Sequence, residues 1–454
     1  MDSRQMIENP IGVFSKYTKR LGPSFTFHFG GLKTAIVSSD PAVMQHVLKT
    51  NSENYQKSEI QMKRMRHFIG PGLLTFHGKQ WQTQRRLIQH GFSPAKLEAM
   101  SSLMQECLSE SLERFDALTR TGSVDIYPEM MRMTFRMVSR SLFSASIRDE
   151  DVEYISKTIS TCQQFMVRQI VQPYLDPWFA VSGELRKHEQ MRDHGDGIIL
   201  DYVRRRRRNP GSYDDLLQIL LDAVYSDTGQ GMTDESILHE SMQLLVAGHE
   251  TSSNALCWTL YLLARHPQYI ERIRSEYDRE IGDAPLRYSD IPRLEFTTQV
   301  IEESLRLYPP FWMVDRVAVE NDRIADMAVP RGTIMVVFIY GAHHSPKFWN
   351  DPELFIPERF SKDNRKDHTP FAYLPFGGGP RGCIGGNYAM LQMLMILGTI
   401  LRRYDFALAE DQEILPRPMI ILRPNDGIRM TFAGREGKTT DIRRPQARAV
   451  TRSS

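Results

Sequence analysis

Apolar side chains recur three or four positions apart along most of the chain, which is the spacing of one face of a helix. The longest such stretches cover residues 98–118, 127–144, 151–172, 182–208 and 233–265. Residues 24–29 instead alternate aromatic and polar side chains and lead through two glycines into 34–37, which indicates a hairpin. Residues 333–340 are β-branched and aromatic, as in a strand. The pattern predicts a mainly α protein with a small β region.

Two further segments shape the expected architecture. Residues 233–265 are expected to form one long helix, because Thr233 can cap its start and His266 and Pro267 end the periodic run. At about 1.5 Å per residue this helix would be roughly 50 Å long, enough to cross the molecule. Residues 58–74 have a mixed pattern interrupted by glycines, so we expect a long, adaptable loop there.

Composition narrows the class of protein. The 454 residues contain no linker-like stretch or repeat, so we expect one domain, and 41% hydrophobic residues supply a sizeable core. The net charge of +2 gives no general attraction to nucleic acid, and no nucleic-acid partner is expected. Four cysteines without paired spacing favour a reducing compartment, which predicts a cytoplasmic protein. Residues 1–20 have no apolar segment, so no membrane anchor is expected.

Residues 376–386 concentrate chemistry around Cys383. Six glycines lie within seven positions of its sulfur. Glycine lets the backbone approach a flat ligand without a Cβ clash, and N–H groups freed by such a turn can hold the sulfur as a thiolate. Arg381 offers a fork for a carboxylate. A thiolate ligand, a cation for a carboxylate and a flat ligand lying against the glycines are together the features of a haem site. The alternative is a buried cysteine in a glycine-rich turn.

The run from Phe376 to Gly385 matches Phe-x-x-Gly-x-Arg-x-Cys-x-Gly at every fixed position. In this the chain resembles the cytochrome P-450 family of haem-thiolate monooxygenases, and its soluble bacterial members in particular. The resemblance implies a triangular helical prism with a long central helix, and haem b (iron protoporphyrin IX) with Cys383 as the iron ligand. It implies a single domain over 1–454, with a helical lobe, a β-rich lobe near 20–60, 310–345 and 410–432, and a polar tail at 435–454.

The middle of the long expected helix carries a second group of candidates. Gly248 weakens a helix, and the Thr251 hydroxyl can bond back to a carbonyl one turn earlier, so we expect a local break there. By resemblance, Ala247 and Gly248 leave room for dioxygen beside the haem, and Glu250 and Thr251 deliver protons. Taken alone, these residues would also suit an ordinary core helix.

A third group is expected to be structural. Glu303 and Arg306 lie three residues apart on a predicted helix, and residues 357–360 read Pro-Glu-Arg-Phe. By resemblance, Glu303, Arg306 and Arg359 form a buried charge network behind the cysteine loop. The excess positive charge would have to be met by backbone carbonyls. The alternative is a surface ion pair.

Haem carries two propionates, which need cations. By resemblance, Trp81 and Arg85 face one propionate, Arg316 and Arg381 bind as well, and His77 also reaches. The alternative for each arginine is a solvated charge. The resemblance assigns the substrate pocket to an apolar set: Leu244, Phe311, Trp312, Met313, Val314, Met419 and Ile420.

Two conspicuous runs of like residues are expected to have no ligand-binding or catalytic role. The arginines at 204–208 fall at a predicted helix end, where positive charge complements the helix dipole, so we expect a solvated end. His343 and His344 are expected to be loop histidines, because adjacent residues face different ways and no spaced third ligand accompanies them.

The resemblance implies a monomeric monooxygenase that inserts one oxygen atom of O2 into a small organic substrate, by hydroxylation or oxidative O-demethylation. Fatty acids, terpenoids, steroids and small methylated compounds remain open as substrates. Electrons are expected from a separate ferredoxin or flavodoxin and its NAD(P)H reductase. The alternatives are a peroxide-driven or non-redox haem-thiolate enzyme, such as a peroxygenase or an isomerase, and a non-catalytic haem sensor.

Overall fold

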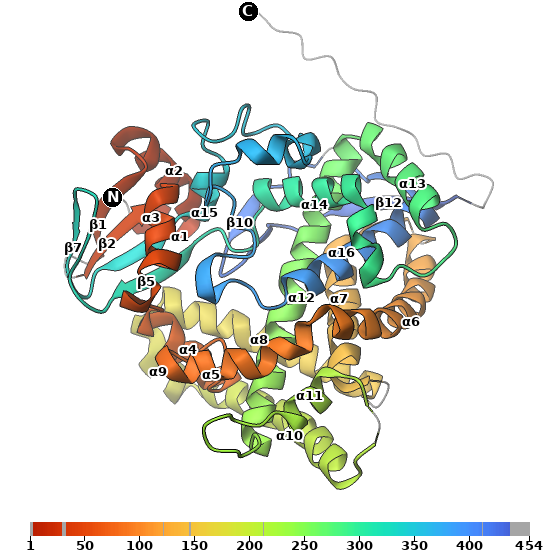
Figure 1. Cartoon of the computed structure of the whole chain (residues 1–454), viewed down its shortest axis with the longest axis horizontal. Helices are drawn as coiled ribbons and strands as arrows, with labels where there is room; N and C mark the ends of the chain where they lie inside the picture. Colours follow the sequence, from red (N-terminus) through yellow and green to blue (C-terminus); the bar gives the residue numbers. More distant parts are fainter. Residues whose placement is uncertain are drawn as a thin grey trace, which may run out of the picture.

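Helices make up most of the chain, as the apolar spacing predicts (Figure 1). The computed structural model describes residues 3–29, 33–120, 122–144, 147–211, 213–410 and 412–435, so the expected polar tail lies outside them from residue 436 onward. The α-helices are α1 (Ser3–Glu8), α2 (Pro10–Leu21), α3 (Pro41–Gln45), α4 (Glu59–Ile69), α5 (Gly78–Gln89), α6 (Pro94–Thr119), α7 (Ile126–Phe143), α8 (Asp149–Val171), α9 (Asp176–Val181), α10 (Glu184–Arg208), α11 (Leu216–Asp222), α12 (Asp234–Arg265), α13 (Gln268–Glu280), α14 (Glu295–Leu307), α15 (Ile339–His343) and α16 (Gly386–Arg403).

Short helical turns connect several of these elements. The 3-10 turns are η2 (Ser52–Asn54), η3 (His90–Phe92), η5 (Pro173–Leu175), η6 (Tyr288–Arg293), η7 (Pro357–Phe360), η8 (Asn364–Asp367) and η9 (Gly379–Arg381). A π-helix, η1 (His46–Thr50), continues directly from α3.

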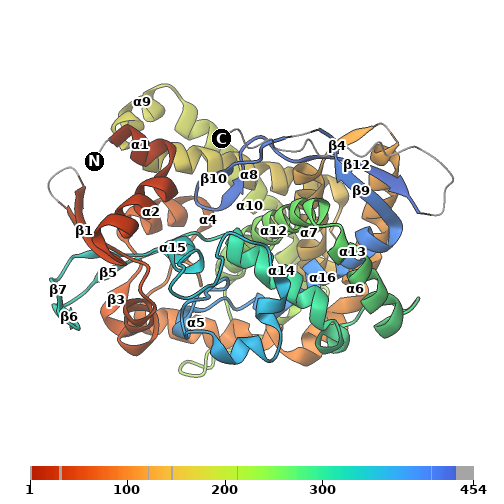
Figure 2. The ribbon, with the colours of Figure 1, turned by 90° about the horizontal axis from the view of Figure 1, so that it is seen from above.

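The helix α12 runs through the middle of the molecule in both views (Figures 1 and 2). It begins where predicted, because the Thr233 side chain accepts a hydrogen bond from the backbone N–H of Ser236 at 3.1 Å. It packs against α7, α10, α14 and α16, and its second half is buried on almost every side, as befits a helix that is apolar all round. No helix in the described part of the chain is long and apolar enough to cross a membrane.

In the part of the chain that the structure describes, the strands form four small sheets. The largest has the order β1 (Ser24–Phe29), β2 (Lys33–Ser38), β8 (Ile334–Val337), β5 (Val314–Ala318) and β3 (Tyr55–Gln56). Only the β2–β8 pairing in this sheet is parallel, and β1 and β2 form the predicted hairpin. The others are β4 (Ser123–Asp125), β12 (Arg429–Gly434) and β9 (Tyr404–Leu408), then β10 (Pro416–Pro418) with β11 (Leu422–Pro424), and β6 (Asp322–Ile324) with β7 (Met327–Val329).

The five-stranded sheet packs against α2 through an aromatic cluster. Phe14 of α2 contacts Trp312 and Phe338, with ring centroids 6.1 and 5.4 Å away. Trp312 is only 4% exposed, and its indole N–H donates to the carbonyl of Met419 at 2.9 Å. The sequence predicted Trp312 in the substrate pocket. The structure instead gives it a packing role, because its large ring fills the sheet–helix interface while its N–H is satisfied.

The segment 58–74 was wrongly predicted to be an adaptable loop. It contains the helix α4, whose Met62 is buried and which ends at Gly70 with φ of +73°. The residues that follow are tied to α12, because Glu240 accepts a hydrogen bond from the backbone N–H of Leu73 at 2.9 Å. Gly70 therefore marks the end of a helix, and the side chain of Glu240, far along the sequence, holds the following turn in place.

Candidate haem and oxygen site

The cysteine loop lies between η9 and α16 and rests on a distant part of the chain. The backbone N–H of Cys383 donates to the carbonyl of Phe376 at 2.8 Å and closes the loop. Gly379 has φ of +67°, and a Cβ built there would lie 1.9 Å from the carbonyl oxygen of Leu48 on η1. Both the conformation and the space require glycine. The close backbone approach predicted from the glycines is therefore present at Gly379, where the neighbouring group is the backbone of Leu48.

Cys383 is the exposed cysteine, whereas the other three are buried. Desolvation by the surrounding protein raises the pKa of the thiol, while the N–H of Gly385 and the guanidinium of Arg85 act to lower it. Metal coordination displaces the proton of such a thiol. Cys383 is therefore the cysteine that is placed to hold a haem iron.

Arg85 is held at the cysteine loop itself. Its Nη1 donates to the carbonyl of Gly382 at 2.8 Å, next to Cys383. The sequence predicted that Arg85 binds a propionate. The contact with Gly382 ties α5 to the loop and brings a positive charge near the sulfur, where it favours the thiolate, and propionate binding by Arg85 stays a prediction.

Three cations lie close enough to repel one another, and among the described residues none of them donates a hydrogen bond to a carboxylate. Arg316, Arg381 and Lys57 donate to the backbone carbonyls of Asp315 at 2.6 Å, Phe76 at 3.0 Å and Leu74 at 2.7 Å, respectively. Burial and the neighbouring Arg316 lower the pKa of Arg381 to about 10. Burial, Arg316 and Arg381 lower the pKa of Lys57 to about 7. Positive charges that destabilise one another in a partly buried site suit a dianionic ligand such as the two propionates of haem.

Two uncharged groups complete this cluster. Both ring nitrogens of His77 are buried without a hydrogen-bond partner, although Nε2 lies 3.9 Å from Glu59. Trp81 supports Arg381, whose guanidinium lies 4.3 Å from its ring centroid. The residues present therefore fit haem. Lys57 could not be predicted, because a lone lysine between β3 and α4 belongs to no motif.

The middle of α12 has an open face. Ala247 is exposed although Leu245 and His249 beside it are buried, so this side of the helix borders unfilled space. The Thr251 hydroxyl donates to the carbonyl of Ala247 at 3.1 Å, as expected. A small side chain and a hydroxyl thus lie together where a diatomic molecule could fit.

The expected break in this helix is absent. The helix α12 is continuous from Asp234 to Arg265. A Cβ at Gly248 would lie 2.8 Å from Cγ2 of Val138, so Gly248 allows α12 to approach α7 closely. Glycine is therefore required at position 248 by the close packing of α7 and α12, and not by a kink.

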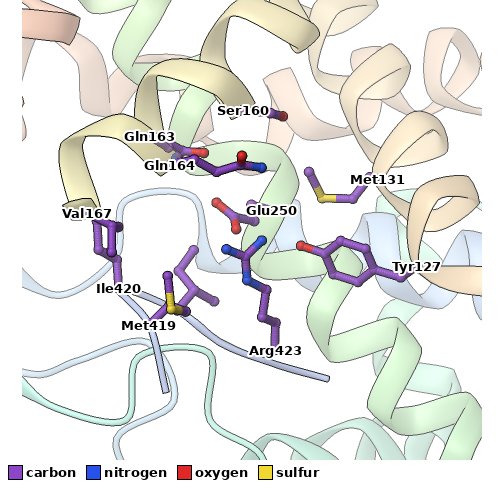
Figure 3. A pocket seen from close by; sticks show the side chains of 11 residues that line it. Tyr127, Met131, Ser160, Gln163, Gln164, Val167, Glu250, Met419, Ile420 and Arg423 are labelled. Carbon is purple, nitrogen blue, oxygen red and sulfur yellow. The ribbon is translucent and has the colours of Figure 1, made fainter. Parts of the chain in front are cut away.

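Glu250 faces a cavity of about 120 Å³ (Figure 3). Its side chain is 8% exposed. Burial raises the pKa of Glu250, while Arg423 and Gln163 act to lower it. Sequence analysis had no signal for Arg423, because it lies on β11, far along the chain from α12.

The expected substrate residues are divided by the structure. Leu244 is buried on α12, while Phe311 is 42% exposed, and Met313 and Val314 are half-buried near the start of β5. Met419 and Ile420 line the cavity of Glu250 together with the polar residues there. The predicted set is therefore not one continuous wall.

The predicted charge network is present. Glu303 accepts two hydrogen bonds from Arg306 at 2.7 and 2.9 Å, one from Arg359 at 3.2 Å and one from the backbone N–H of Ile356 at 3.0 Å. Arg306 also donates to the carbonyls of His343, Pro352 and Leu354. These carbonyls meet the excess positive charge, as expected. Glu303 and Arg306 are fully buried, which excludes a surface ion pair.

The comparisons with known proteins agree with this site. The cytochrome P-450 family description matches residues 3–432. Cyclooctatin synthase of Streptomyces melanosporofaciens is 30% identical over 397 residues, covering 86% of this chain and 85% of its own. An ultra-long-chain fatty acid omega-hydroxylase of Homo sapiens is 28% identical over 423 residues, covering 88% and 79%. The crystal structure of the haem domain of cytochrome P-450DA superposes with a TM-score of 0.85 at 25% identity and 94% coverage of both chains.

A cysteine in a glycine loop, a cluster of buried cations, and a helix that carries an exposed alanine beside a hydroxyl together describe a haem-thiolate protein. The chain belongs to the cytochrome P-450 family. It is accordingly a haem-dependent monooxygenase, and the predicted mainly helical fold is confirmed.

Proposed function

We propose that this chain binds haem b through Cys383 and oxidises a small apolar molecule with O2, using electrons from a ferredoxin or flavodoxin and its NAD(P)H reductase. The observation that carries the proposal is the placement of Ala247 and Thr251 on the open face of α12, beside an acid at Glu250. A hydroxyl and a carboxyl next to an oxygen site are of use when protons must accompany electrons to O2.

Each residue has a distinct task in this proposal. Bound through the Cys383 thiolate, the haem supplies the chemistry of O2 activation. Arg316, Arg381 and Lys57 hold the propionates, and His77 adds a hydrogen bond. Thr251 holds a proton at its hydroxyl near the oxygen site, and Glu250 supplies it. Glu303, Arg306 and Arg359 fix the segments behind the loop and take no part in the chemistry.

The proposed substrate is apolar, with hydroxylation or oxidative O-demethylation as the reaction. Leu244 on α12 and Met313 and Val314 at β5 offer apolar surface. Two relatives support this choice, since their names place one on an ultra-long-chain fatty acid and another on cyclooctat-9-en-7-ol. We propose a fatty acid or terpenoid as the substrate of this monomeric, cytoplasmic enzyme.

Spectroscopy and turnover together test the proposal. The reduced protein should give the thiolate-type carbon-monoxide band, and Cys383→Ser should abolish it while Cys257→Ser retains it. A panel of fatty acids and terpenoids is then screened by the shift of the haem absorption band. Hits should be oxidised when a reductase system and NAD(P)H are supplied. Product with hydrogen peroxide alone, and none with any reductase, would instead identify a peroxygenase.

A further inference from the structure

The cavity that Glu250 faces has polar walls in addition to the apolar side chains of Met419 and Ile420. It lies between α7, α8, α12 and β11, and its polar lining comes from Tyr127, Ser160, Gln163, Gln164 and Arg423 (Figure 3). We propose that this cavity is the inlet through which solvent protons reach Glu250, and that Arg423 is the positioning residue that keeps Glu250 able to exchange them. The proposal rests on the proposed function, because it supplies the protons that the reaction with O2 consumes.

The hairpin of β10 and β11 places Arg423 firmly. Leu422 is fully buried, and its backbone N–H donates to the carbonyl of Pro310 at 2.8 Å. Successive side chains on a strand point to opposite faces, so a buried Leu422 directs Arg423 the other way. Figure 3 shows the Arg423 guanidinium between the Glu250 carboxyl and the Tyr127 hydroxyl. Arg417, its cross-strand partner on β10, is exposed.

The charges around Glu250 are few and well defined. Tyr127 comes from α7 and Arg423 from β11, while α8 contributes the uncharged Gln163 and Gln164. Burial raises the pKa of Glu250, and Arg423 is the first of the groups that oppose it. Burial and then Glu250 raise the pKa of Tyr127, and Arg423 acts against both. Arg423 is therefore the charged group whose effect on the pKa of Glu250 opposes that of burial.

A proton carrier works best when its pKa lies near the working pH, because it must both take up and release the proton. Burial alone would favour the protonated form of Glu250, whereas a fully ion-paired carboxylate would favour the deprotonated form. A polar cavity of about 120 Å³ has room for water, which needs polar partners such as these to be held.

The proton balance of the reaction is simple. Substrate C–H, O2, two electrons from the reductase and two protons give substrate C–OH and one water. For each proton, an O–H bond of hydronium in the cavity breaks as the O–H bond of the Glu250 carboxyl forms. Glu250 then passes the proton through bound water to the Thr251 hydroxyl, returns to the carboxylate, and is reprotonated from the cavity.

The test compares Arg423→Gln with the matched control Arg417→Gln in the haem-loaded enzyme. Product formed per NAD(P)H consumed is measured against pH with an identified substrate. Productive coupling falls as pH rises through the pKa of Glu250. Arg423→Gln should move this midpoint upward by about one pH unit, the effect of losing one nearby opposite charge. Arg417→Gln and the charge-retaining Arg423→Lys should leave the midpoint in place.

A second measurement does not depend on turnover. Infrared difference spectra of the resting enzyme, with the Glu250 carboxylic-acid band assigned by its loss in Glu250→Gln, report the protonation of Glu250 directly. The band should persist to higher pH in Arg423→Gln, and in Gln163→Leu to a smaller extent, which covers the case that Arg423→Gln folds poorly. Equal titration of the band in the wild type, Arg423→Gln and Gln163→Leu would overturn the proposal.

Turnover with hydrogen peroxide distinguishes a failure of this proposal from a failure of the proposed function. Peroxide brings its own protons and electrons, so peroxide-driven product in Arg423→Gln should match that of the wild type. A wild type that forms product with peroxide but none with any reductase system would refute the proposed function, whereas the infrared titration would still decide the role of Arg423. Equal loss of peroxide-driven and reductase-driven product in Arg423→Gln would show general damage and would also overturn the proposal.

Discussion

Replacing Glu303 with alanine is expected to destabilise the fold rather than slow a chemical step. The substitution removes the acceptor of four hydrogen bonds, three of them from Arg306 and Arg359. Charged hydrogen bonds are worth about 1.5–3 kcal/mol each, but Arg306 keeps three carbonyl acceptors, so the loss is smaller than their sum. Breaking a buried ion pair typically costs about 3–5 kcal/mol, a large part of the roughly 5–15 kcal/mol that keeps a protein folded.

The control is Glu295→Ala on the same helix α14. Glu295 pairs with Lys362 at the surface, where a salt bridge is worth about 0–1 kcal/mol. The free energy of unfolding is obtained from guanidinium titrations of both variants, with haem content measured in parallel. Glu303→Ala should lose several kcal/mol and most of its haem, and Glu295→Ala should resemble the wild type. Equal stability of the two variants would refute the assignment of Glu303 to a buried network.

Three further substitutions test the site and the fold. Gly379→Ala places a Cβ 1.9 Å from the Leu48 carbonyl, so it should prevent haem incorporation as measured by the carbon-monoxide spectrum, whereas Gly385→Ala, with its nearest atom at 3.6 Å, should retain it; full haem in both would contradict the loop geometry. Thr251→Ala should bind haem and substrate normally but divert NAD(P)H to hydrogen peroxide, and unchanged product per NAD(P)H would remove Thr251 from proton delivery. Burial raises the pKa of Asp322, but hydrogen bonds from Tyr55, His46 and Asn51 outweigh it and lower it from 3.8 to about 2. This stability is therefore present above about pH 4 and lost as pH falls to about 2, so Asp322→Asn should be less stable than the wild type by on the order of 2 kcal/mol at pH 7 and equal to it near pH 2 in urea titrations.

The cysteine loop and the long helix could be predicted because each is a local pattern. Ten consecutive residues describe the loop, and the limits of α12 follow from Thr233 and Pro267. Lys57 and Arg423 could not be found in this way. Their roles depend on contacts with segments far away in the sequence, and a single basic residue has no spacing to reveal it.

Two runs of like residues were misjudged for the same reason. The arginines at 204–208 were expected to be solvated, but Arg206 is buried in an ion pair with Asp215 at 2.9 Å. His343 was expected in a loop, yet it is buried at the end of α15 and its Nε2 accepts the backbone N–H of Leu374 at 2.9 Å. The composition of a run does not show which of its residues is buried. The burial of Arg206 and of His343 depends on partners elsewhere in the chain.

The contact between Gly379 and Leu48 bears on the order in which the protein is made. The carbonyl on which the cysteine loop rests belongs to η1, some 330 residues nearer the N-terminus. A ribosome therefore makes Leu48 long before it makes the loop, whereas the five-stranded sheet is completed only when β5 and β8 have been made. Cys383 follows both strands in the sequence, so η1 and the sheet can be in place before the thiol is made, while α16 and β9 to β12 are made after it.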